Sequence, residues 1–333
     1  MAWSSRTGPS AFSRPGRRPR PPEQPGSQVY AAAMRIAITG STGMIGTALS
    51  AALTEDSHEI VRLVRHTHPD ETAGERHWSP FGEPDPKPYE GCDVVVHLAG
   101  AGLGDKRWSA AYKREIRESR VHGTDTLARS LAQLAEPPKA LLSASAIGFY
   151  GDTGSTPVTE DSAGSEDFLG ALCRDWEAAT KPAEDAGIPV THLRNGVVLG
   201  GSGGALARML PFFKAGIGGP IGSGRQYFSF IGMADHLAAL QHIMALTVDG
   251  NMTGAVNVTG PLPVTNRAFT KALGHVLHRP TVMPVPGFAL RVLFGQMADE
   301  LTGSQRVLPA RLTESGFAFS TPDPRSALAA ALE

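Results

Sequence analysis

The stretch that decides the fold reads Thr39-Gly40-Ser41-Thr42-Gly43-Met44-Ile45-Gly46. It follows a short β-branched run, residues 35–39, and precedes a segment with apolar residues at helical spacing, so it is expected to turn from a strand into a helix. In that setting Gly40 permits a tight turn, Gly43 lets a phosphate approach the backbone, and Gly46 lets the helix pack closely. The free N–H groups and the dipole at the start of the helix attract phosphate. The stretch therefore predicts a dinucleotide-binding turn, since a merely tight turn would need only one glycine.

Strand-like and helical segments alternate after this turn. Continuous apolar runs predict buried strands, and apolar residues three or four positions apart predict helices. The expected strands are residues 35–39, 59–64, 93–98, 140–145 and 190–199, and the expected helices include residues 109–134 and one around Trp176. This alternation predicts an α/β fold, a Rossmann-type doubly wound parallel sheet with a smaller C-terminal substrate lobe.

Three regions are expected along the 333 residues. Residues 1–33 are rich in Ser, Pro, Gly and Arg and lack periodicity, so they are expected to lie outside the fold. They are read as an extension before an effective start at Met34, as a disordered basic tail, or as an organellar transit peptide. Residues 34–199 form the expected nucleotide-binding core, to which residues 235–258 return. Residues 200–333, where Gly and Pro become dense, form most of the expected substrate lobe.

Composition narrows the classes of partner. The formal net charge of −1 gives no reason to expect nucleic acid or an anionic membrane as a partner. Two cysteines, Cys92 and Cys173, are too few for a disulfide framework, and no metal site is expected. Because no apolar run approaches the roughly 20 residues of a membrane span, the expected location is cytoplasmic, with organellar import as the alternative. The oligomeric state is left open, and a small-molecule substrate is the expected partner.

The end of the second strand bears on the choice of nicotinamide cofactor. NAD sites usually place an acid about 20 residues beyond the turn, but the chain there reads Val61-Arg62-Leu63-Val64-Arg65-His66, with no acid after Glu59. Arg65 can bind a 2′-phosphate in bidentate fashion. NADP(H) is therefore the predicted cofactor. The alternative is that Arg62 and Arg65 are solvated charges at the strand end, and it applies more to Arg62.

A basic residue lies on the apolar stripe of the long helix. Arg120 shares a face with Ile116, Gly123 and Leu127. An Arg on a core-facing stripe is costly unless it is paired. A cofactor phosphate or ribose could pair it, as could Glu115; alternatively, Arg120 reaches solvent at the helix edge.

These segments resemble a known family, the extended short-chain dehydrogenase/reductases, and more closely its atypical, sugar-nucleotide-epimerase-like subgroup. The stretches that carry the resemblance are the glycine turn and residues 93–100, 143–151, 120–124, 168–177, 194–200 and 218–226, with residues 261–330 similar to the subgroup's C-terminal domain of unknown function. The resemblance implies cofactor contacts at the turn and at Arg65, Leu98, Ala99, neighbouring Gly100, Glu115, Arg120 and Val198.

One departure from the family concerns its proton relay. Ordinary members use a Tyr-x-x-x-Lys pair, in which the Lys lowers the pKa of the Tyr so that it can exchange a proton. The corresponding positions here hold Leu169 and Cys173, which cannot do this. Ser145 occupies the position of the family's catalytic Ser, and Tyr150 could supply a proton; the alternative for Tyr150 is a half-buried aromatic whose hydroxyl reaches backbone or water. Cys173 is expected to be a small buried thiol.

Two further polar residues are expected to be structural. His97 is interpreted as a partner at a strand end, and Asp235 as the N-cap of a helix. Together these observations favour an NADP(H)-dependent oxidoreductase acting on a small carbonyl or sugar-like compound. A non-catalytic NADP(H)-binding sensor, and an epimerase or dehydratase with a non-standard proton relay, remain as alternatives.

Overall fold

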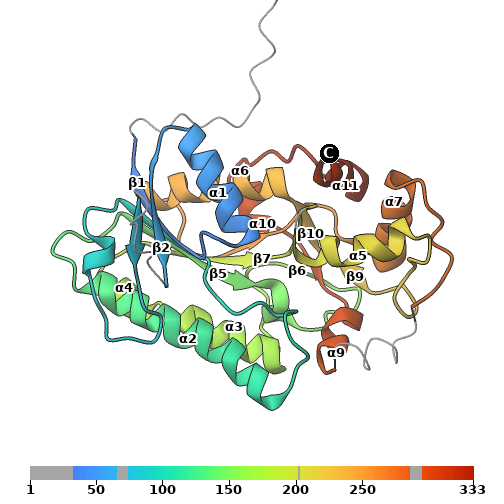
Figure 1. The fold of residues 1–333 in the computed structure, drawn as a ribbon, viewed down its shortest axis with the longest axis horizontal. Coiled ribbons are helices and arrows are strands. Elements are labelled where there is room, and N and C mark those ends of the chain that lie inside the picture. The colour runs from blue at the N-terminus through green and yellow to red at the C-terminus, as the bar shows by residue number, and fades with distance from the viewer. Residues whose placement is uncertain (1–32, 66–73, 202, 286–294) are drawn as a thin grey trace, which may run out of the picture.

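A parallel sheet runs through the middle of the protein (Figure 1). The computed structural model describes residues 33–65, 74–201, 203–285 and 295–333. Within them the central sheet has seven strands in the order β11-β7-β5-β4-β1-β2-β3, and every neighbouring pair is parallel. The strands are β1 (Arg35–Thr39), β2 (Glu59–Val64), β3 (Glu75–His77), β4 (Val94–His97), β5 (Ala140–Ala146), β7 (Val190–Asn195) and β11 (Gly254–Val258). The strand order reverses between β1 and β4, so the predicted Rossmann-type fold is confirmed.

Helices cover both faces of this sheet (Figure 1). One face carries α1 (Met44–Glu55) and α6 (Met233–Val248), and the other carries α2 (Ala110–Ala132), α3 (Phe168–Ala178) and α4 (Lys181–Asp185). The three consecutive valines of β4 face both layers of helices: Val94 and Val96 pack with α1 and α6, whereas Val95 packs with Leu127 of α2. A strand that is buried on both faces favours such a continuous apolar run.

The remaining elements lie mostly beyond one end of the sheet, on the right in Figure 1. They are η1 (Lys87–Tyr89), η2 (Ile147–Tyr150), β6 (Pro157–Val158), β8 (Val197–Leu199), α5 (Gly204–Lys214), β9 (Tyr227–Phe228), β10 (Phe230–Gly232), β12 (Val264–Thr265), α7 (Asn266–Val276), α9 (Met297–Thr302), β13 (Arg306–Val307), α10 (Ala310–Glu314) and α11 (Pro324–Leu332). Several of them share a separate apolar core that includes Phe213, Phe230 and Phe269. The boundary between core and substrate lobe stays a prediction, and residues 1–32 lie outside the described residues.

The structure corrects two expectations about local elements. The segment 190–199 is two strands rather than one, because β7 ends before Gly196 and β8 leaves the central sheet to pair with β10. Asp235 is not an N-cap: α6 begins at Met233, with Gly232 in the capping position. The buried carboxylate of Asp235 instead accepts hydrogen bonds of 2.5 to 2.8 Å from the backbone and hydroxyl groups of Ser320 and Thr321. Long-range partners therefore decide its role, and a sequence pattern cannot show them.

Across the described ranges, no helix is both long and apolar enough to cross a membrane.

Candidate functional site

The glycine-rich turn lies against the end of β4. Gly40 has a φ of +66°, and a Cβ there would lie 2.9 Å from the carbonyl carbon of Leu98. A Cβ on Gly46 would lie 2.2 Å from the carbonyl oxygen of Gly40. No side chain fits at either position, since atoms this close would force the backbone apart. The tight turn and close helix packing predicted for these two glycines are confirmed.

The same turn leaves polar groups open to a ligand. Helix α1 has Gly43 as its N-cap, so its first-turn N–H groups donate to no capping side chain. Thr42 and Gly43 are exposed, whereas Ser41 is buried, and its Oγ has no hydrogen-bond partner among the described residues. An anion at this helix start would satisfy both the first-turn N–H groups and the Ser41 hydroxyl. The residues present therefore fit the diphosphate of a dinucleotide.

A buried hydrogen-bond chain fixes the ends of β1 and β4. Thr39 Oγ1 accepts from the N–H groups of Leu98 and Ala99, at 3.1 and 3.2 Å, so it donates its own hydrogen to Nδ1 of His97, 2.7 Å away. Nε2 of His97 then donates to Thr124 Oγ1, at 3.0 Å. Burial lowers the pKa of His97 to about 4, which keeps the ring neutral. The structural role predicted for His97 is confirmed. Because the N–H groups of Leu98 and Ala99 already donate to Thr39, the predicted cofactor contacts at these residues would involve other atoms.

Arg65 follows β2 beside the glycine turn. Leu63 of β2 pairs in register with Thr39, the last residue of β1, and Arg65 lies two residues further along. Its side chain is exposed. Arg62 is not simply solvated, as the alternative interpretation had it, because its guanidinium forms an ion pair with Glu75 on β3 at 3.2 Å. Of these two arginines, Arg65 is the one available to a 2′-phosphate.

Arg120 does not reach solvent. Only 9% of its surface is exposed, which contradicts the alternative that it snorkels. Its Nη1 donates to the carbonyl oxygens of Ala101 and Ile116, at 2.9 and 3.3 Å. Its Cζ lies 5.0 Å from the ring centre of Trp176 on α3. The packing of α2 against α3 therefore holds the charge inside the protein.

Three other residues were predicted to contact the cofactor, namely Gly100, Glu115 and Val198, and each has a different environment. Glu115 does not pair with Arg120: it binds Lys106 Nζ, at 2.8 and 3.1 Å, on the exposed side of α2. Adjacent helix positions are turned by about 100°, so residues next to a buried position face elsewhere. A Cβ on Gly100 would lie 3.3 Å from Arg120 Cζ, and Val198 is buried in β8. Cofactor contact at these positions stays a prediction.

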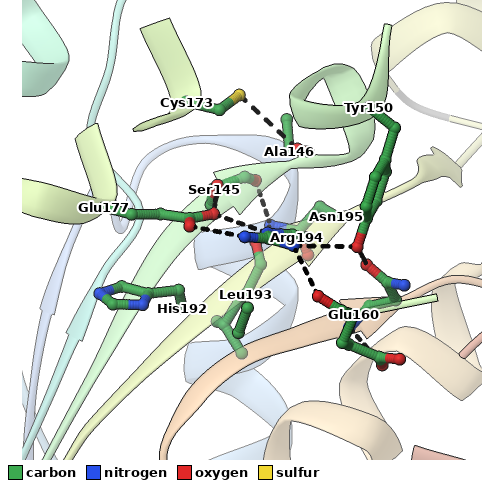
Figure 2. A network of polar contacts seen from close by, with 12 residues as sticks. Ser145, Ala146, Tyr150, Glu160, Cys173, Glu177, His192, Leu193, Arg194 and Asn195 are labelled. Carbon is green, nitrogen blue, oxygen red and sulfur yellow. Dashed lines mark hydrogen bonds and ion pairs between the residues drawn. The ribbon is translucent and has the colours of Figure 1, made fainter. Parts of the chain in front are cut away.

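A network that the sequence did not predict surrounds Ser145 (Figure 2). Arg194 of β7 forms a bidentate ion pair with Glu177 of α3, Nε to Oε1 at 2.8 Å and Nη2 to Oε2 at 2.9 Å. Ser145 of β5 lies opposite Arg194 in the sheet and donates its hydroxyl hydrogen to Glu177 Oε1, at 2.7 Å. Burial acts to lower the pKa of Arg194, but Glu177 outweighs it and the pKa is raised. Arg194 thus stays charged, and the Ser145 hydrogen points to the carboxylate.

Tyr150 belongs to the same network (Figure 2). Its hydroxyl donates to Asn257 Oδ1 at 2.7 Å and accepts from Arg194 Nη1 at 3.0 Å. The guanidinium also stacks 3.5 Å from the ring centre of Phe149. Burial raises the pKa of Tyr150. Among the described residues the partners of the hydroxyl are therefore side chains, whereas the alternative interpretation expected backbone or water.

Cys173 faces the end of β5. Its Sγ lies 3.6 Å from the carbonyl oxygen of Ala146, and burial raises the pKa of the thiol to about 12. The prediction of a small buried thiol is confirmed. The described residues also contain no group of three or more His, Cys, Asp or Glu that could hold a metal ion.

Glu177, Arg194 and Asn257 are the residues that sequence reasoning missed. One signal was available: Arg194 is a charged residue within the apolar segment 190–199, and a buried Arg requires an acid. The identity of that acid was not readable, because Glu177 lies on a different element and entered only as the last residue of the stretch 168–177 that carries the family resemblance.

Comparison with known proteins gives a consistent result. Residues 36–259 match the NAD dependent epimerase/dehydratase family, and residues 285–331 match a domain of unknown function, DUF1731. The epimerase family protein Mb2239 of Mycobacterium bovis is 43% identical over 286 residues, 85% of this chain and 93% of the relative. A chloroplastic SDR39U1 homologue of Arabidopsis thaliana is 37% identical over 317 residues, 90% of this chain and 87% of the relative.

A solved structure extends the comparison to three dimensions. The human epimerase family protein SDR39U1 (isoform 2), crystallised with NADPH, superimposes with a TM-score of 0.81 at 33% identity. The match covers 90% of this chain and 99% of the human one.

Proposed function

The chain belongs to the NAD dependent epimerase/dehydratase family, and from that premise we propose that it binds NADP(H) and acts as an oxidoreductase on a small carbonyl or sugar-like compound. The observation that carries the proposal is the open cradle at residues 40–46, with Arg65 beside it. The human relative crystallised with NADPH supports the choice of cofactor.

Each part of the cradle has a distinct task. The N–H groups at the start of α1 and the Ser41 hydroxyl hold the diphosphate. Arg65 binds the 2′-phosphate, which a carboxylate at that position would repel. When bound, the nicotinamide supplies hydride-transfer chemistry.

Ser145 is the proposed contact for the reacting oxygen. It is the second-last residue of β5, at the carboxyl edge of the sheet where ligands of doubly wound folds bind. Because its hydrogen is held by Glu177 Oε1, Ser145 Oγ meets a substrate hydroxyl as an acceptor. In the oxidation direction the substrate hydroxyl passes its proton to Ser145 Oγ while Ser145 passes its own hydrogen to Glu177 Oε1, which Arg194 holds in place; in the reduction of a carbonyl the same two transfers run in reverse and deliver the proton to the substrate oxygen. Tyr150 fixes Arg194 from the other side.

A second candidate function is a non-catalytic NADP(H) sensor. The burial of Ser145 and Tyr150 favours it, since both hydroxyls already have protein partners. Such a protein binds NADPH and leaves it unoxidised.

One titration tests the shared premise. NADPH and NADH are each titrated against the purified protein by fluorescence, and we expect NADPH to bind at least about tenfold more tightly. Failure of both to bind refutes the cofactor proposal. If NADPH binds, its oxidation with a panel of small carbonyl compounds separates the oxidoreductase from the sensor.

Location and partners follow from the same proposal. We propose a cytoplasmic protein whose partner is a small molecule, with organellar import as the alternative suggested by the chloroplastic relative. Fractionation of cells that produce the full chain distinguishes the two locations.

A further inference from the structure

Acidic residues are distributed unevenly along the chain. Residues 186–234 and 250–298 contain no Asp or Glu, so all 32 acids lie elsewhere, whereas both segments contain Lys and Arg. These two segments include α5 and α7, which lie at the right-hand end of the molecule in Figure 1. The formal net charge of −1 therefore conceals two long segments whose own charged side chains are all basic.

Helix α7 carries a basic stripe on its outer side. Arg267, Lys271 and His275 recur every four residues, which places them on one helix face, and all three are exposed. Phe269 and Leu273 lie on the other side of the helix and are buried in the apolar core that α7 shares with α5. The packing of α7 on this core therefore keeps the basic stripe in solvent.

The end of α5 lies beside the chain that follows α7. Arg279 Nε donates a hydrogen bond to the carbonyl oxygen of Lys214, the last residue of α5, at 2.9 Å. A Cβ on Gly219 would lie 1.6 Å from the carbonyl oxygen of Met283, so the two backbones touch there. Basic side chains from separate segments are thus gathered in one region. We call this region the basic tip and define it as residues 212–219 and 267–283.

Large apolar side chains are exposed on the basic tip as well. In the part of the chain that the structure describes, six large apolar side chains are more than half exposed, and four of them belong to the tip. These four are Phe212, Ile217, Val282 and Met283, with exposures of 56%, 54%, 81% and 56%. Single exposed apolar side chains are common, whereas a group of them beside charged residues indicates an interaction surface.

The charges and the apolar side chains together limit the class of partner. Arg208, earlier on α5, binds Asp105 at 3.0 Å, but Lys214 and Lys271 form no ion pair with any described residue. Their charge attracts an anionic surface. Sites for single-stranded nucleic acid use aromatic side chains on which bases stack, yet three of the four exposed apolar side chains are not aromatic. Apolar side chains among Lys and Arg are typical of segments that lie on an anionic bilayer.

We propose that the basic tip binds reversibly to the surface of a bilayer that contains anionic phospholipids. Lys214, Lys271 and Arg279 bind the lipid phosphates, while Phe212 and Ile217 enter between the headgroups. The net charge gave no reason to expect such a partner, because it averages over the acid-free segments.

The length of α5 separates the basic tip from the glycine-rich turn. A Cβ on Gly204, the first residue of α5, would lie 3.2 Å from Cε of Met44 in the turn, whereas Lys214 at the other end belongs to the tip. At about 1.5 Å per residue the helix spans about 15 Å. Substitutions in the tip should therefore leave NADPH binding unchanged, and NADPH affinity and melting temperature together report that a variant is folded.

The test is sedimentation of the full-length protein with lipid vesicles. Vesicles of phosphatidylcholine alone are compared with vesicles that contain equal parts of phosphatidylcholine and phosphatidylglycerol. We expect sedimentation with the anionic vesicles only, and weaker sedimentation at high salt because salt screens the attraction.

Charge reversal tests the cations of the tip. Lys214→Glu/Lys271→Glu should lower the partition coefficient for anionic vesicles at least about tenfold. The matched control is Lys87→Glu/Arg114→Glu, which changes the net charge equally at exposed positions outside the tip. The control should stay within about threefold of the original protein.

Two further variants test whether the apolar side chains enter the bilayer. Phe212→Ser should weaken vesicle binding at least about threefold, whereas Phe81→Ser should not, although Phe81 is 59% exposed. In a second measurement that needs no loss of binding, lipids with brominated acyl chains should quench the added fluorescence of Ile217→Trp. The added fluorescence of Phe81→Trp should not be quenched.

The Arg-rich N-terminal segment provides a competing explanation for vesicle binding. Arg17→Glu/Arg18→Glu tests it, because these substitutions remove two of the positive charges in that segment. If this variant loses as much vesicle binding as Lys214→Glu/Lys271→Glu, the N-terminal segment is the contact and the proposal is wrong.

Three other results overturn the proposal. The first is a failure of the original protein to sediment with anionic vesicles; binding to polyglutamate through Lys214 and Lys271 would then identify an acidic protein as the partner. The second is an equal loss of binding in the tip variants and their controls. The third is unquenched fluorescence of Ile217→Trp on bound vesicles, which would also decide the matter if another variant failed to fold. None of these results bears on the proposed function, which depends on the titration with NADPH.

Discussion

Glu177 and Arg194 join helix α3 to strand β7 through a bidentate ion pair whose side chains are only 13% and 6% exposed. Ser145 and Tyr150 are hydrogen-bonded to opposite sides of this pair. The two residues nominated from the sequence as catalytic are thus connected to each other through two residues that were not nominated (Figure 2).

Removal of one partner of this ion pair should strongly destabilise the protein. We expect Glu177→Ala to lower the free energy of unfolding by about 3–5 kcal/mol, because Arg194 would be left buried without an anion. The measurement is urea unfolding. The exposed pair Arg117–Asp175 provides the control: Asp175→Ala should cost at most about 1 kcal/mol. Equal costs for the two variants would show that the buried pair contributes no more than a surface pair.

Cofactor preference should depend on Arg65. We expect Arg65→Glu to weaken NADPH binding by at least about tenfold and to shift the preference toward NADH, because a carboxylate repels the 2′-phosphate. Fluorescence titration of both cofactors measures this. Arg62→Glu is the control, since Arg62 is already paired with Glu75. Unchanged relative affinities in Arg65→Glu would contradict the 2′-phosphate assignment.

Gly40 should be intolerant of any side chain. Gly40→Ala combines a positive φ with a Cβ 2.9 Å from the backbone of Leu98, and should abolish NADPH binding as well as destabilise the fold. Gly187→Ala isolates the first effect, because Gly187 has a φ of +82° and open space around its Cβ position. Gly187→Ala should lower the free energy of unfolding by about 1–2 kcal/mol and leave NADPH binding intact. Thermal unfolding and NADPH titration are the measurements, and equal effects of the two variants would argue against the close approach.

Two buried histidines should make the protein sensitive to mild acid. Burial lowers the pKa values of His97 and His236 from 6.5 to about 4. Between these values the unfolded chain binds a proton at each ring and the folded protein does not. The free energy of unfolding should therefore fall as the pH drops from 6.5 to 4, by about 1.4 kcal/mol per pH unit for each histidine. Urea unfolding across this range measures the slope.

Two variants test whether His97 causes this change in the free energy of unfolding with pH. His97→Gln should remove the contribution of one proton, whereas His122→Gln, at an exposed position of α2, should leave the slope unchanged. An identical slope in the original protein and His97→Gln would mean that His97 titrates normally in the folded state.

Asp235 should anchor the C-terminal segment to α6. Asp235→Ala removes an acceptor for the backbone and hydroxyl groups of Ser320 and Thr321, and we expect it to cost about 3 kcal/mol. Asp323→Ala, which removes an N-cap of α11, should cost only about 1 kcal/mol. Thermal unfolding compares the two, and a larger loss for Asp323→Ala would contradict the anchoring role.

Local backbone features were readable from the sequence. The strands 35–39 and 59–64 have the predicted bounds, and Gly40 and Gly46 have the predicted geometry. These features depend on neighbours within a few residues: alternating burial, a positive φ, a helix start. The sequence alone therefore determined the Rossmann-type fold and the position of the glycine-rich turn.

Only the tertiary structure decided which polar side chains meet. Ser145, Glu177 and Arg194 come from three elements, and their contact depends on the sheet register and on how α3 packs. The same holds for Asp235, which binds residues 85 and 86 positions away and not its own helix start. A buried charge indicates that a partner is needed but not which residue it is, because every acid in the chain carries the same chemistry until folding excludes all but one.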